Sequence, residues 1–585
     1  MKSFLKNLLS TILGIILSFI ILMVLCIGII SIISMNSKKE IQIEPNTILK
    51  IDFKNPIVER KSTNPLDEIS LTNSEPKKTI ELKQVLDNIE KAKNDDNIQA
   101  IYLNASTINA GLSQTEEIRN KLLDFKSSGK KIIAYAEWYS QKSYYLSSLA
   151  NKLYLNPEGI VELSGFSANI MFFKGLLEKL NIEMQIIRHG KFKSAVEPFI
   201  AESMSQENRE QTKLYLSDLA NNIFDSISSQ RNLRLKDVEK YINQLALNTA
   251  ENCKELGFVD DLMYEDQVET SLKSITEAEE LNFISLKKYS NVKSENKKKI
   301  SRDKIAIIYA TGEISSGKGD YDKIGSITTA KAIKNAREDE KVKAIVLRVN
   351  SPGGSALASD VIWRETILTK GIKPIVVSMG DVAASGGYYI ACAADSIVAN
   401  PTTITGSIGV FGMIPNMQPF YKKTLGITID TVNTHKYSDI GSFNRGLTNF
   451  EKAKIQESVE KIYDTFISNV AEGRKIAKEE IDQIGQGRVW SGYNAKQIGL
   501  IDVFGGLEKA IKIAADLAKL TNYRTISLPK EKNSFEEILK DISSKTSAQF
   551  ILKNLGIHES DFEAIENLLD NDYIQARLPY LITLE

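Results

Sequence analysis

A single serine at the end of an apolar run is the residue of this chain best placed for nucleophilic chemistry. Residues 374–390 read Pro-Ile-Val-Val-Ser-Met-Gly-Asp-Val-Ala-Ala-Ser-Gly-Gly-Tyr-Tyr-Ile, so Ser385 follows a β-branched run and precedes two glycines. This order predicts a buried strand that turns sharply into a helix at Ser385. On such a nucleophile elbow the backbone N–H of Gly386 can face a developing oxyanion. The same residues also suit a turn that merely lets a helix pack closely on its sheet.

The composition is that of an ordinary globular protein. The chain has 585 residues, enough for two or more domains, with 42% hydrophobic and 25% charged residues. Lysine plus arginine number 74, as do aspartate plus glutamate, so the net charge gives no reason to expect a nucleic-acid partner. The sequence holds neither a zinc-ligand cluster nor a Walker-type loop, and we expect no metal and no cofactor. Three scattered cysteines argue against a disulfide framework.

The N-terminal segment has the properties of a membrane anchor. No charged residue lies between Lys6 and Lys38, and residues 8–33 are dominated by isoleucine and leucine. About 25 apolar residues in a helix are long enough to cross the hydrocarbon core of a bilayer. A cleavable signal peptide has a shorter apolar core, so we expect an uncleaved transmembrane helix over about 8–33, within a first segment 1–45. Lysines also follow the span, so charge counting does not favour an external position for the large domain.

The rest of the chain contains an internal repeat. Residues 88–103 align without gaps with residues 332–347, which lie 244 positions further on. The same offset carries Tyr144-Tyr145 onto Tyr388-Tyr389. A match of this length indicates a tandem duplication, with one copy over about 46–275 and the other over about 302–528.

Both copies alternate short apolar runs with amphipathic segments, which predicts mostly parallel sheets covered by helices. We expect a first α/β repeat with its linker over 46–300 and a second α/β repeat over 301–528. Residues 529–585 alternate charged and apolar positions, which favours a C-terminal helical tail to which the sequence assigns no role.

The two copies differ in complementary ways. Ser385 of the second copy aligns with Gln141 of the first, and the Ser-Pro-Gly-Gly loop at 351–354 has no glycine counterpart there. In the other direction, Lys193 of the first copy aligns with Ser438. Drift after duplication explains any one of these differences. Their coordinated loss in opposite halves favours one site built from both copies.

Four linked motifs resemble the signal peptide peptidase A (protease IV) family, in its long, duplicated, membrane-anchored bacterial form. They are Lys-Ser-Ala-Val-Glu-Pro-Phe (193–199), Ser-Pro-Gly-Gly (351–354), Ala-Ala-Ser-Gly-Gly-Tyr-Tyr (383–389) and Asn-Pro-Thr-Thr-Ile-Thr-Gly-Ser-Ile-Gly-Val-Phe-Gly (400–412). The resemblance implies a Clp-protease/crotonase-like α/β fold in each half and a serine–lysine dyad. It also implies a ring-like homo-oligomer, expected to be a tetramer. The anchor would lie in the bacterial inner membrane with the catalytic part in the periplasm, and the substrates would be cleaved signal peptides and other apolar peptides.

Carried over by motif, the resemblance makes Ser385 the nucleophile and Lys193 the general base. It assigns a supporting hydroxyl to Ser407, and it assigns the oxyanion donors to the backbone N–H groups near Gly354 and of Gly386.

This chemistry sets a requirement on the lysine. A serine hydroxyl becomes a nucleophile only when a base takes its proton, and an ordinary lysine, with a pKa of about 10.4, is protonated at neutral pH. Burial without a carboxylate partner disfavours the ammonium form. We therefore expect Glu197 to point away from Lys193 and Ser407 to hold the neutral amine.

Other readings remain open on the sequence alone. Lys191 would share the strand face of Lys193, so spacing does not choose between them, and only the repeat comparison favours Lys193. His189 is a competing base, although no carboxylate stands out to orient its ring. A non-catalytic membrane scaffold of the same fold is the alternative function. Acyl-CoA chemistry on a crotonase-like fold would not need a serine–lysine pairing across two repeats.

Overall fold

The computed structural model describes residues 10–11, 13–15, 17–18, 21, 43–61, 79–277, 280–293, 301–530 and 574–578. Most of the expected span over 8–33 and most of the expected tail lie outside these residues. Within the described ranges, no helix combines the length and the apolar character that a membrane crossing requires.

The first repeat is built on a six-stranded parallel sheet with strand order β8-β6-β5-β4-β1-β9. Its strands are β1 (Thr47–Ile51), β4 (Ile98–Asn104), β5 (Lys131–Ala136), β6 (Lys152–Leu155), β8 (Asp261–Leu262) and β9 (Asn282–Ser285). Alternate strand residues point to opposite faces. Leu49 and Ile101 pack with helices α2 (Leu82–Lys93), α3 (Leu112–Lys126) and α4 (Gln141–Ser147), whereas Ile48 and Ala100 pack with α10 (Glu265–Thr276).

The second repeat is built on an eight-stranded sheet. Its main path runs β19-β17-β15-β13-β10-β21, and β16 and β20 extend it beside β15. The strands are β10 (Lys304–Thr311), β13 (Val342–Ser351), β15 (Ile375–Ala384), β16 (Ser396–Ala399), β17 (Ile404–Gly406), β19 (Val489–Ser491), β20 (Val503–Phe504) and β21 (Arg524–Leu528). The covering helices are α12 (Ser326–Glu338), α13 (Ala356–Thr369), α14 (Gly386–Ala391), α15 (Asn449–Arg474) and α18 (Leu507–Leu517). The aligned segments of the two copies thus form the same elements, β4 matching β13 and α4 matching α14.

A third sheet joins the two repeats, with order β12-β11-β14-β22-β18-β7. Its strands are β7 (Glu183–Arg188), β11 (Glu313–Ser315), β12 (Lys323–Gly325), β14 (Gly353–Ser355), β18 (Phe411–Asn416) and β22 (Ile574–Arg577). Strand β7 comes from the first repeat and pairs antiparallel with β18 of the second, from Arg188 opposite Phe411 to Glu183 opposite Asn416. Of the segment expected to be a helical tail, residues 574–577 form a strand of this sheet.

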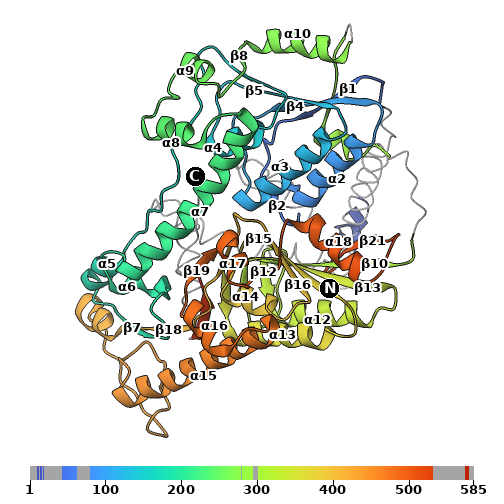
Figure 1. Cartoon of the computed structure of the whole chain (residues 1–585). Coiled ribbons are helices and arrows are strands. Elements are labelled where there is room, and N and C mark those ends of the chain that lie inside the picture. The colour runs from blue at the N-terminus through green and yellow to red at the C-terminus, as the bar shows by residue number, and fades with distance from the viewer. Residues whose placement is uncertain are drawn as a thin grey trace.

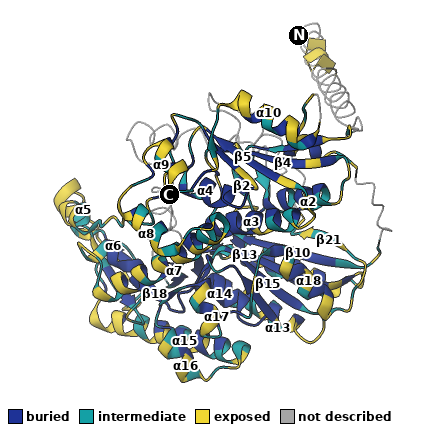
Figure 2. Ribbon diagram, turned by 45° about the horizontal axis from the view of Figure 1, so that its top comes forward, coloured by how far each residue is buried: buried dark blue, intermediate teal, exposed yellow. Residues whose placement is uncertain are grey.

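Helix α3 of the first repeat also enters the contact between the halves, where it lies in the buried middle of the molecule (Figures 1 and 2). The contact is strongly polar. Arg348 of β13 is fully buried, and its guanidinium donates to Glu59 at 2.7 and 2.9 Å and to Glu117 of α3 at 2.7 Å. Asp381 of β15 accepts from the backbone N–H of Ser113 at 2.8 Å, so the second repeat caps the start of α3.

Candidate active site

Ser385 lies at the turn between β15 and α14, as its sequence context predicts. The strand ends at Ala384, the helix begins at Gly386, and Ser385 adopts φ 55° and ψ −114°. Positive φ is unfavourable for a residue with a side chain and costs on the order of 1–3 kcal/mol, so the fold must hold it there. The Ser385 N–H donates to the Gly406 carbonyl at 2.8 Å, and this bond fixes the turn.

Lys193 reaches the second repeat because of the β7–β18 pairing. Beyond β7, the N–H of His189 donates to Val410 O at 3.1 Å and the N–H of Phe192 donates to Gln486 O at 3.0 Å. Gly487 lies directly against the lysine backbone, where a Cβ on residue 487 would come within 2.6 Å of Lys193 N. The loop of the first repeat is therefore laid along the main chain of the second.

The two side chains meet. Lys193 Nζ lies 2.9 Å from Ser385 Oγ, 3.1 Å from Ser407 Oγ and 3.3 Å from Ser407 O. All three residues are 0% exposed. Burial lowers the pKa of the Lys193 amine well below its ordinary value of 10.5. In this environment a neutral amine can accept the proton of the serine hydroxyl.

Glu197 does not pair with the lysine, as expected. Its carboxylate accepts from Ser205 N at 3.2 Å, from Ser205 Oγ at 2.6 Å and from Asn208 Nδ2 at 2.9 Å. These donors come from the start of α7 (Gln206–Arg231). The buried carboxylate is thus satisfied without neutralising Lys193.

Gln211 of α7 is a site residue that the sequence did not reveal. Its amide nitrogen donates to Phe192 O and to Ser194 Oγ, each at 3.1 Å, on either side of Lys193. Its amide oxygen accepts from Val489 N of the second repeat at 3.0 Å. The buried Gln211 side chain therefore links the loop that carries Lys193, here called the lysine loop, to the second repeat. A glutamine on an amphipathic helix carries no signal that would set it apart.

The competing bases are placed elsewhere. Lys191 is exposed. His189 does have a carboxylate partner, since its Nδ1 lies 2.6 Å from Glu460 Oε2, and its ring stacks on Tyr463. Among the described residues, the hydrogen bonds of Ser385 Oγ are with Lys193 Nζ and the Gly409 carbonyl.

The glycine loop packs against the serine turn. Gly353 has φ +104°, and a Cβ at this position would lie 2.8 Å from Gly386 N. Gly354 has φ +152°, and a Cβ there would lie 2.1 Å from Ile314 O of β11. Gly353 therefore faces Gly386, whereas Gly354 faces the neighbouring strand. The assignment of the oxyanion N–H groups near Gly354 and of Gly386 stays a prediction.

The corresponding place in the first repeat is closed. Gln141, the counterpart of Ser385, donates to Gly165 O at 3.1 Å and accepts from Gly165 N at 2.9 Å. Gly165 is the counterpart of Gly409, whose carbonyl faces Ser385 Oγ. The side-chain amide of Gln141 thus occupies the place in the first repeat that Ser385 has in the second.

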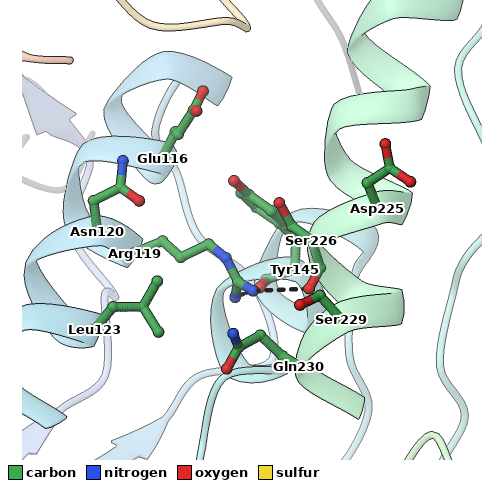
Figure 3. Close-up of a pocket in the computed structure, with 9 residues that line it drawn as sticks. All are labelled: Glu116, Arg119, Asn120, Leu123, Tyr145, Asp225, Ser226, Ser229 and Gln230. Carbon is green, nitrogen blue, oxygen red and sulfur yellow. Dashed lines mark hydrogen bonds between the residues drawn. The ribbon is translucent and has the colours of Figure 1, made fainter. Parts of the chain in front are cut away.

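A separate pocket of about 300 Å³ lies in the first repeat between α3, α4 and α7 (Figure 3). It is lined by Glu116, Arg119, Asn120, Leu123, Tyr145, Asp225, Ser226, Ser229 and Gln230. The Arg119 guanidinium lies over the Tyr145 ring and donates to the Ser226 carbonyl at 3.3 Å. None of the residues around Ser385 lines this pocket.

Comparison with known proteins gives the family. The model of peptidase family S49 matches residues 124–279 and 368–521, one region in each repeat. The chain belongs to peptidase family S49. The peptidase is 37% identical to Protease 4 of Salmonella typhi, over 87% of this chain and 84% of that one. It is 36% identical to the chloroplastic serine protease SPPA of Arabidopsis thaliana, over 85% and 74% of the two chains.

These matches confirm the tandem α/β duplication and a serine peptidase of the signal peptide peptidase A (protease IV) type. Among solved structures, a membrane-bound stomatin-specific protease is similar with 15% identity and a TM-score of 0.27, over 42% of this chain and 98% of that one. That likeness is too weak to carry an argument about function.

Proposed function

We propose that the peptidase cleaves apolar peptides, cleaved signal peptides among them, with Ser385 as nucleophile and Lys193 as general base. The observation that carries this proposal is the 2.9 Å separation of Lys193 Nζ and Ser385 Oγ in a fully buried setting. Burial is the cause of the lowered pKa of Lys193, and no carboxylate beside the amine raises that pKa again. In the proposal Ser407 orients the amine, and the N–H groups near Gly354 and of Gly386 receive the oxyanion.

The reaction proceeds in two halves. Ser385 Oγ attacks the carbonyl carbon of the scissile peptide bond while its proton passes to the neutral Lys193 amine. The C–N bond then breaks, the lysine ammonium returns the proton to the leaving amine, and an acyl-enzyme on Ser385 remains. Water attacks this ester while Lys193 again takes the proton. The C–Oγ bond then breaks, the lysine ammonium returns the proton to Ser385 Oγ, and the carboxyl product leaves. Backbone donors that stabilise the oxyanion contribute about 100- to 1000-fold each in turnover.

The surroundings of Lys193 favour apolar side chains. Ala195, Val196, Phe411 and Met413 form a buried cluster beside it. The Phe411 ring centre lies 5.9 Å from Lys193 Nζ. An apolar substrate side chain next to the scissile bond would extend this cluster and keep water from the amine.

The test is hydrolysis of a fluorogenic apolar peptide by the full chain. Ser385→Ala and Lys193→Ala should each abolish the activity, and Lys191→Ala should retain it because that lysine is exposed. Full activity in Lys193→Ala would refute the assigned base. Full activity in Ser385→Ala would refute the site, and no activity in the native chain on any apolar peptide would favour a scaffold.

We also propose that residues 8–33 anchor the peptidase in the bacterial inner membrane with both repeats in the periplasm. The support is the charge-free apolar segment between Lys6 and Lys38. Protease added to spheroplasts should digest the repeats while the cytoplasm stays intact. Protection of the repeats in intact spheroplasts would reverse the orientation.

A ring-like homo-oligomer, with four copies as the expected number, is the remaining part of the proposal. Within the chain, β7 of the first repeat pairs with β18 of the second. By repeat alignment, the counterparts of these strands are residues 428–433 and 167–172, and neither segment is a strand of the described chain. Both expose apolar side chains, Val432 at 96% and Met171 at 62%. Pairing of these segments between successive copies would repeat the internal contact and close a ring.

The oligomer is tested by light scattering on the detergent-solubilised full chain. Val432→Asp should shift the mass to that of a single copy, because it places a charge in the proposed contact. Lys422→Asp, on an exposed residue outside the two segments, is the control. An unchanged mass in Val432→Asp would locate the contact elsewhere.

A further inference from the structure

The pocket between α3, α4 and α7 contains a buried cation (Figure 3). Arg119 is 2% exposed, and its guanidinium donates to the carbonyls of Tyr145 and Ser226 and to Ser148 Oγ at 3.1 Å. These bonds come from Nη1 and Nη2, and a guanidinium has five N–H donors. The Nε–H and one Nη2–H are therefore left without an acceptor among the described residues.

The charge of Arg119 also lacks a counter-ion. All three acceptors are uncharged, and no carboxylate of the described residues forms an ion pair with this guanidinium. Buried charges in proteins are normally paired, because an isolated one is costly to take out of water. The buried Arg348 follows this rule, since it lies against the carboxylates of Glu59 and Glu117. Arg119 is thus a place for an anion that the described residues do not supply.

The directions of the two arginine pKa values agree with this difference. Burial lowers the pKa of Arg119 below its ordinary value. Burial acts in the same direction on Arg348, but the carboxylates of Glu117 and Glu59 raise the pKa of Arg348 above the ordinary value. An anion bound at Arg119 would have the same effect there.

The second repeat has an aromatic side chain where the first has this cation. The counterpart of Arg119, 244 residues further on in α13, is Trp363. The Trp363 ring meets the Tyr389 ring edge-on, with 6.2 Å between the ring centres. Tyr389 is the counterpart of Tyr145, over which the Arg119 guanidinium lies. The exchange of tryptophan for arginine therefore places a charge where the second repeat has a ring.

Helix α7 also has smaller residues along the pocket than its counterpart α15. Both helices have 26 residues, and aligning them from end to end pairs Ile223 with Phe466 and Ser226 with Asn469. The Phe466 ring lies 4.5 Å from the Tyr389 ring, and Asn469 Nδ2 donates to the Tyr389 hydroxyl at 2.8 Å. Isoleucine and serine fill less volume than these residues. The pocket of about 300 Å³ is therefore a feature in which the first repeat differs from the second.

Glu116, which lines the pocket, does not take the place of the missing counter-ion. Its counterpart Asp360 accepts from the Tyr389 hydroxyl at 2.8 Å, whereas Glu116 accepts from Thr402 Oγ1 of the second repeat at 2.5 Å. Burial raises the pKa of Glu116 to about 7. This carboxyl group is thus partly protonated at neutral pH and opposes a bound anion only weakly.

The outer part of the pocket is polar and exposed. Asn120, Asp225 and Ser229 are exposed, and Gln230 is half-buried. Amide and hydroxyl groups can donate to a carboxylate oxygen, and the Asp225 carboxylate can accept from an ammonium group. The pocket therefore has a buried positive end and an exposed negative rim. Its volume is at the lower limit of ordinary small-molecule sites, which suits a small ligand.

We propose that this pocket binds a short peptide, whose C-terminal carboxylate pairs with Arg119 and whose amino end lies at Asp225. A carboxylate accepts two parallel hydrogen bonds from a guanidinium, and such charged bonds are stronger than neutral ones. A peptidase releases ligands of this kind, because each cleavage creates a new C-terminal carboxylate. The pocket is separate from Ser385, so the inference does not depend on which residues cleave the substrate.

The experiment measures the binding of the dipeptide Ala-Ala by titration calorimetry. The protein is the detergent-solubilised full chain with Ser385→Ala, in which the dipeptide should stay intact. The amide of Ala-Ala, which lacks the carboxylate, should bind at least about tenfold more weakly, because it forfeits hydrogen bonds to a charged group. Acetate, a carboxylate without a peptide, should also bind more weakly than Ala-Ala. No saturable binding of Ala-Ala, or equal affinity for Ala-Ala and either comparison ligand, overturns the inference.

Two variants, each added to Ser385→Ala, locate the binding. Arg119→Trp with Ile223→Phe fills the pocket with the side chains of the second repeat. Ser229→Trp blocks the exposed rim and leaves Arg119 in place, which covers the case in which the first variant does not fold. Both should abolish the binding of Ala-Ala, and the control Arg234→Met, which removes an exposed arginine outside the pocket, should leave it unchanged. Unchanged binding in a folded pocket variant would place the dipeptide elsewhere and overturn the inference.

Discussion

Lys193 Nζ and Ser385 Oγ, 192 residues apart in the chain, lie 2.9 Å from each other without a carboxylate partner for the amine. Each side chain belongs to a different repeat, and the strand pair β7–β18 brings them together. In the proposed mechanism, the protonation state of this buried amine therefore controls catalysis.

The pH profile of kcat/KM should therefore rise through the lowered pKa of Lys193. It should level off well below the ordinary lysine pKa of about 10.4. The sign follows from the need for a neutral amine, which is the form present above the pKa. The profile is measured with the fluorogenic peptide from pH 5 to about 10, alongside fluorophosphonate labelling of Ser385. A plateau reached only near the ordinary lysine pKa would show that the amine is not desolvated in solution.

Lys193→Met should make the folded protein more stable at neutral pH while abolishing activity. Between the lowered folded-state pKa and the unfolded-state value of about 10.4, the unfolded chain binds one proton more than the folded chain. Folding therefore costs free energy at pH 7, and this cost disappears with the amine. Thermal unfolding should show a higher Tm for Lys193→Met, and a smaller difference between the two proteins at pH 9 than at pH 7. A lower Tm at pH 7 would contradict the burial argument.

Gln211→Met should lower kcat more than it raises KM. The substitution keeps the volume of the side chain but leaves Phe192 O and Val489 N without their partner, so the lysine loop loosens from the second repeat. Gln206→Met, on an exposed position of the same helix, is the matched control and should behave as the native chain. Equal kcat values in the two variants would show that Gln211 does not position the lysine.

Arg348→Met should destabilise the protein by about 3–5 kcal/mol, because it leaves the buried carboxylates of Glu59 and Glu117 without a cation. Arg337→Met removes a less buried pair with Glu365 and should cost less than Arg348→Met. Urea unfolding followed by tryptophan fluorescence measures both. Similar losses in the two variants would mean that the contact between the repeats does not depend on Arg348.

Gly353→Ala should reduce kcat/KM by about 100-fold or more, the loss typical of a disturbed oxyanion site. The added methyl group would meet Gly386 N and Ala576 O, and the residue has φ +104°. Gly371→Ala is the control, since Gly371 has φ +83° but nothing within 4 Å of its Cβ position. The control carries only the backbone strain, of roughly 1 kcal/mol. Loss of activity in both variants to the same degree would trace the effect to strain alone.

The local features of the site were predictable from the sequence. The β-branched run before Ser385 and the two glycines after it specify a buried strand, a turn and a helix. The comparison of the repeats pointed to Lys193 where spacing could not, because Lys191 lies two residues away on the same expected face. Both kinds of prediction depend on neighbours in the sequence or on the internal alignment, which a single sequence contains.

The long-range features were not predictable in the same way. Arg348 sits in a run that reads as an ordinary buried strand, and its partner Glu59 is 289 residues away. The same holds for β22, whose four residues are too short to show a period and whose partners are the edges of β14 and β18. Edge pairing is decided by which strands are left free after the sheets have formed, and a single sequence does not state this.

Because Gln141 closes the counterpart site in the first repeat, the turnover number should not depend on the concentration of the protein. Each chain carries one complete reactive pair, and both members travel on the same polypeptide. Linked groups meet at an effective concentration that does not change on dilution, in the millimolar range for short flexible tethers. In the proposed mechanism, the turnover number of a single molecule is therefore set by its own fold, because the amine that activates Ser385 does not come from another molecule.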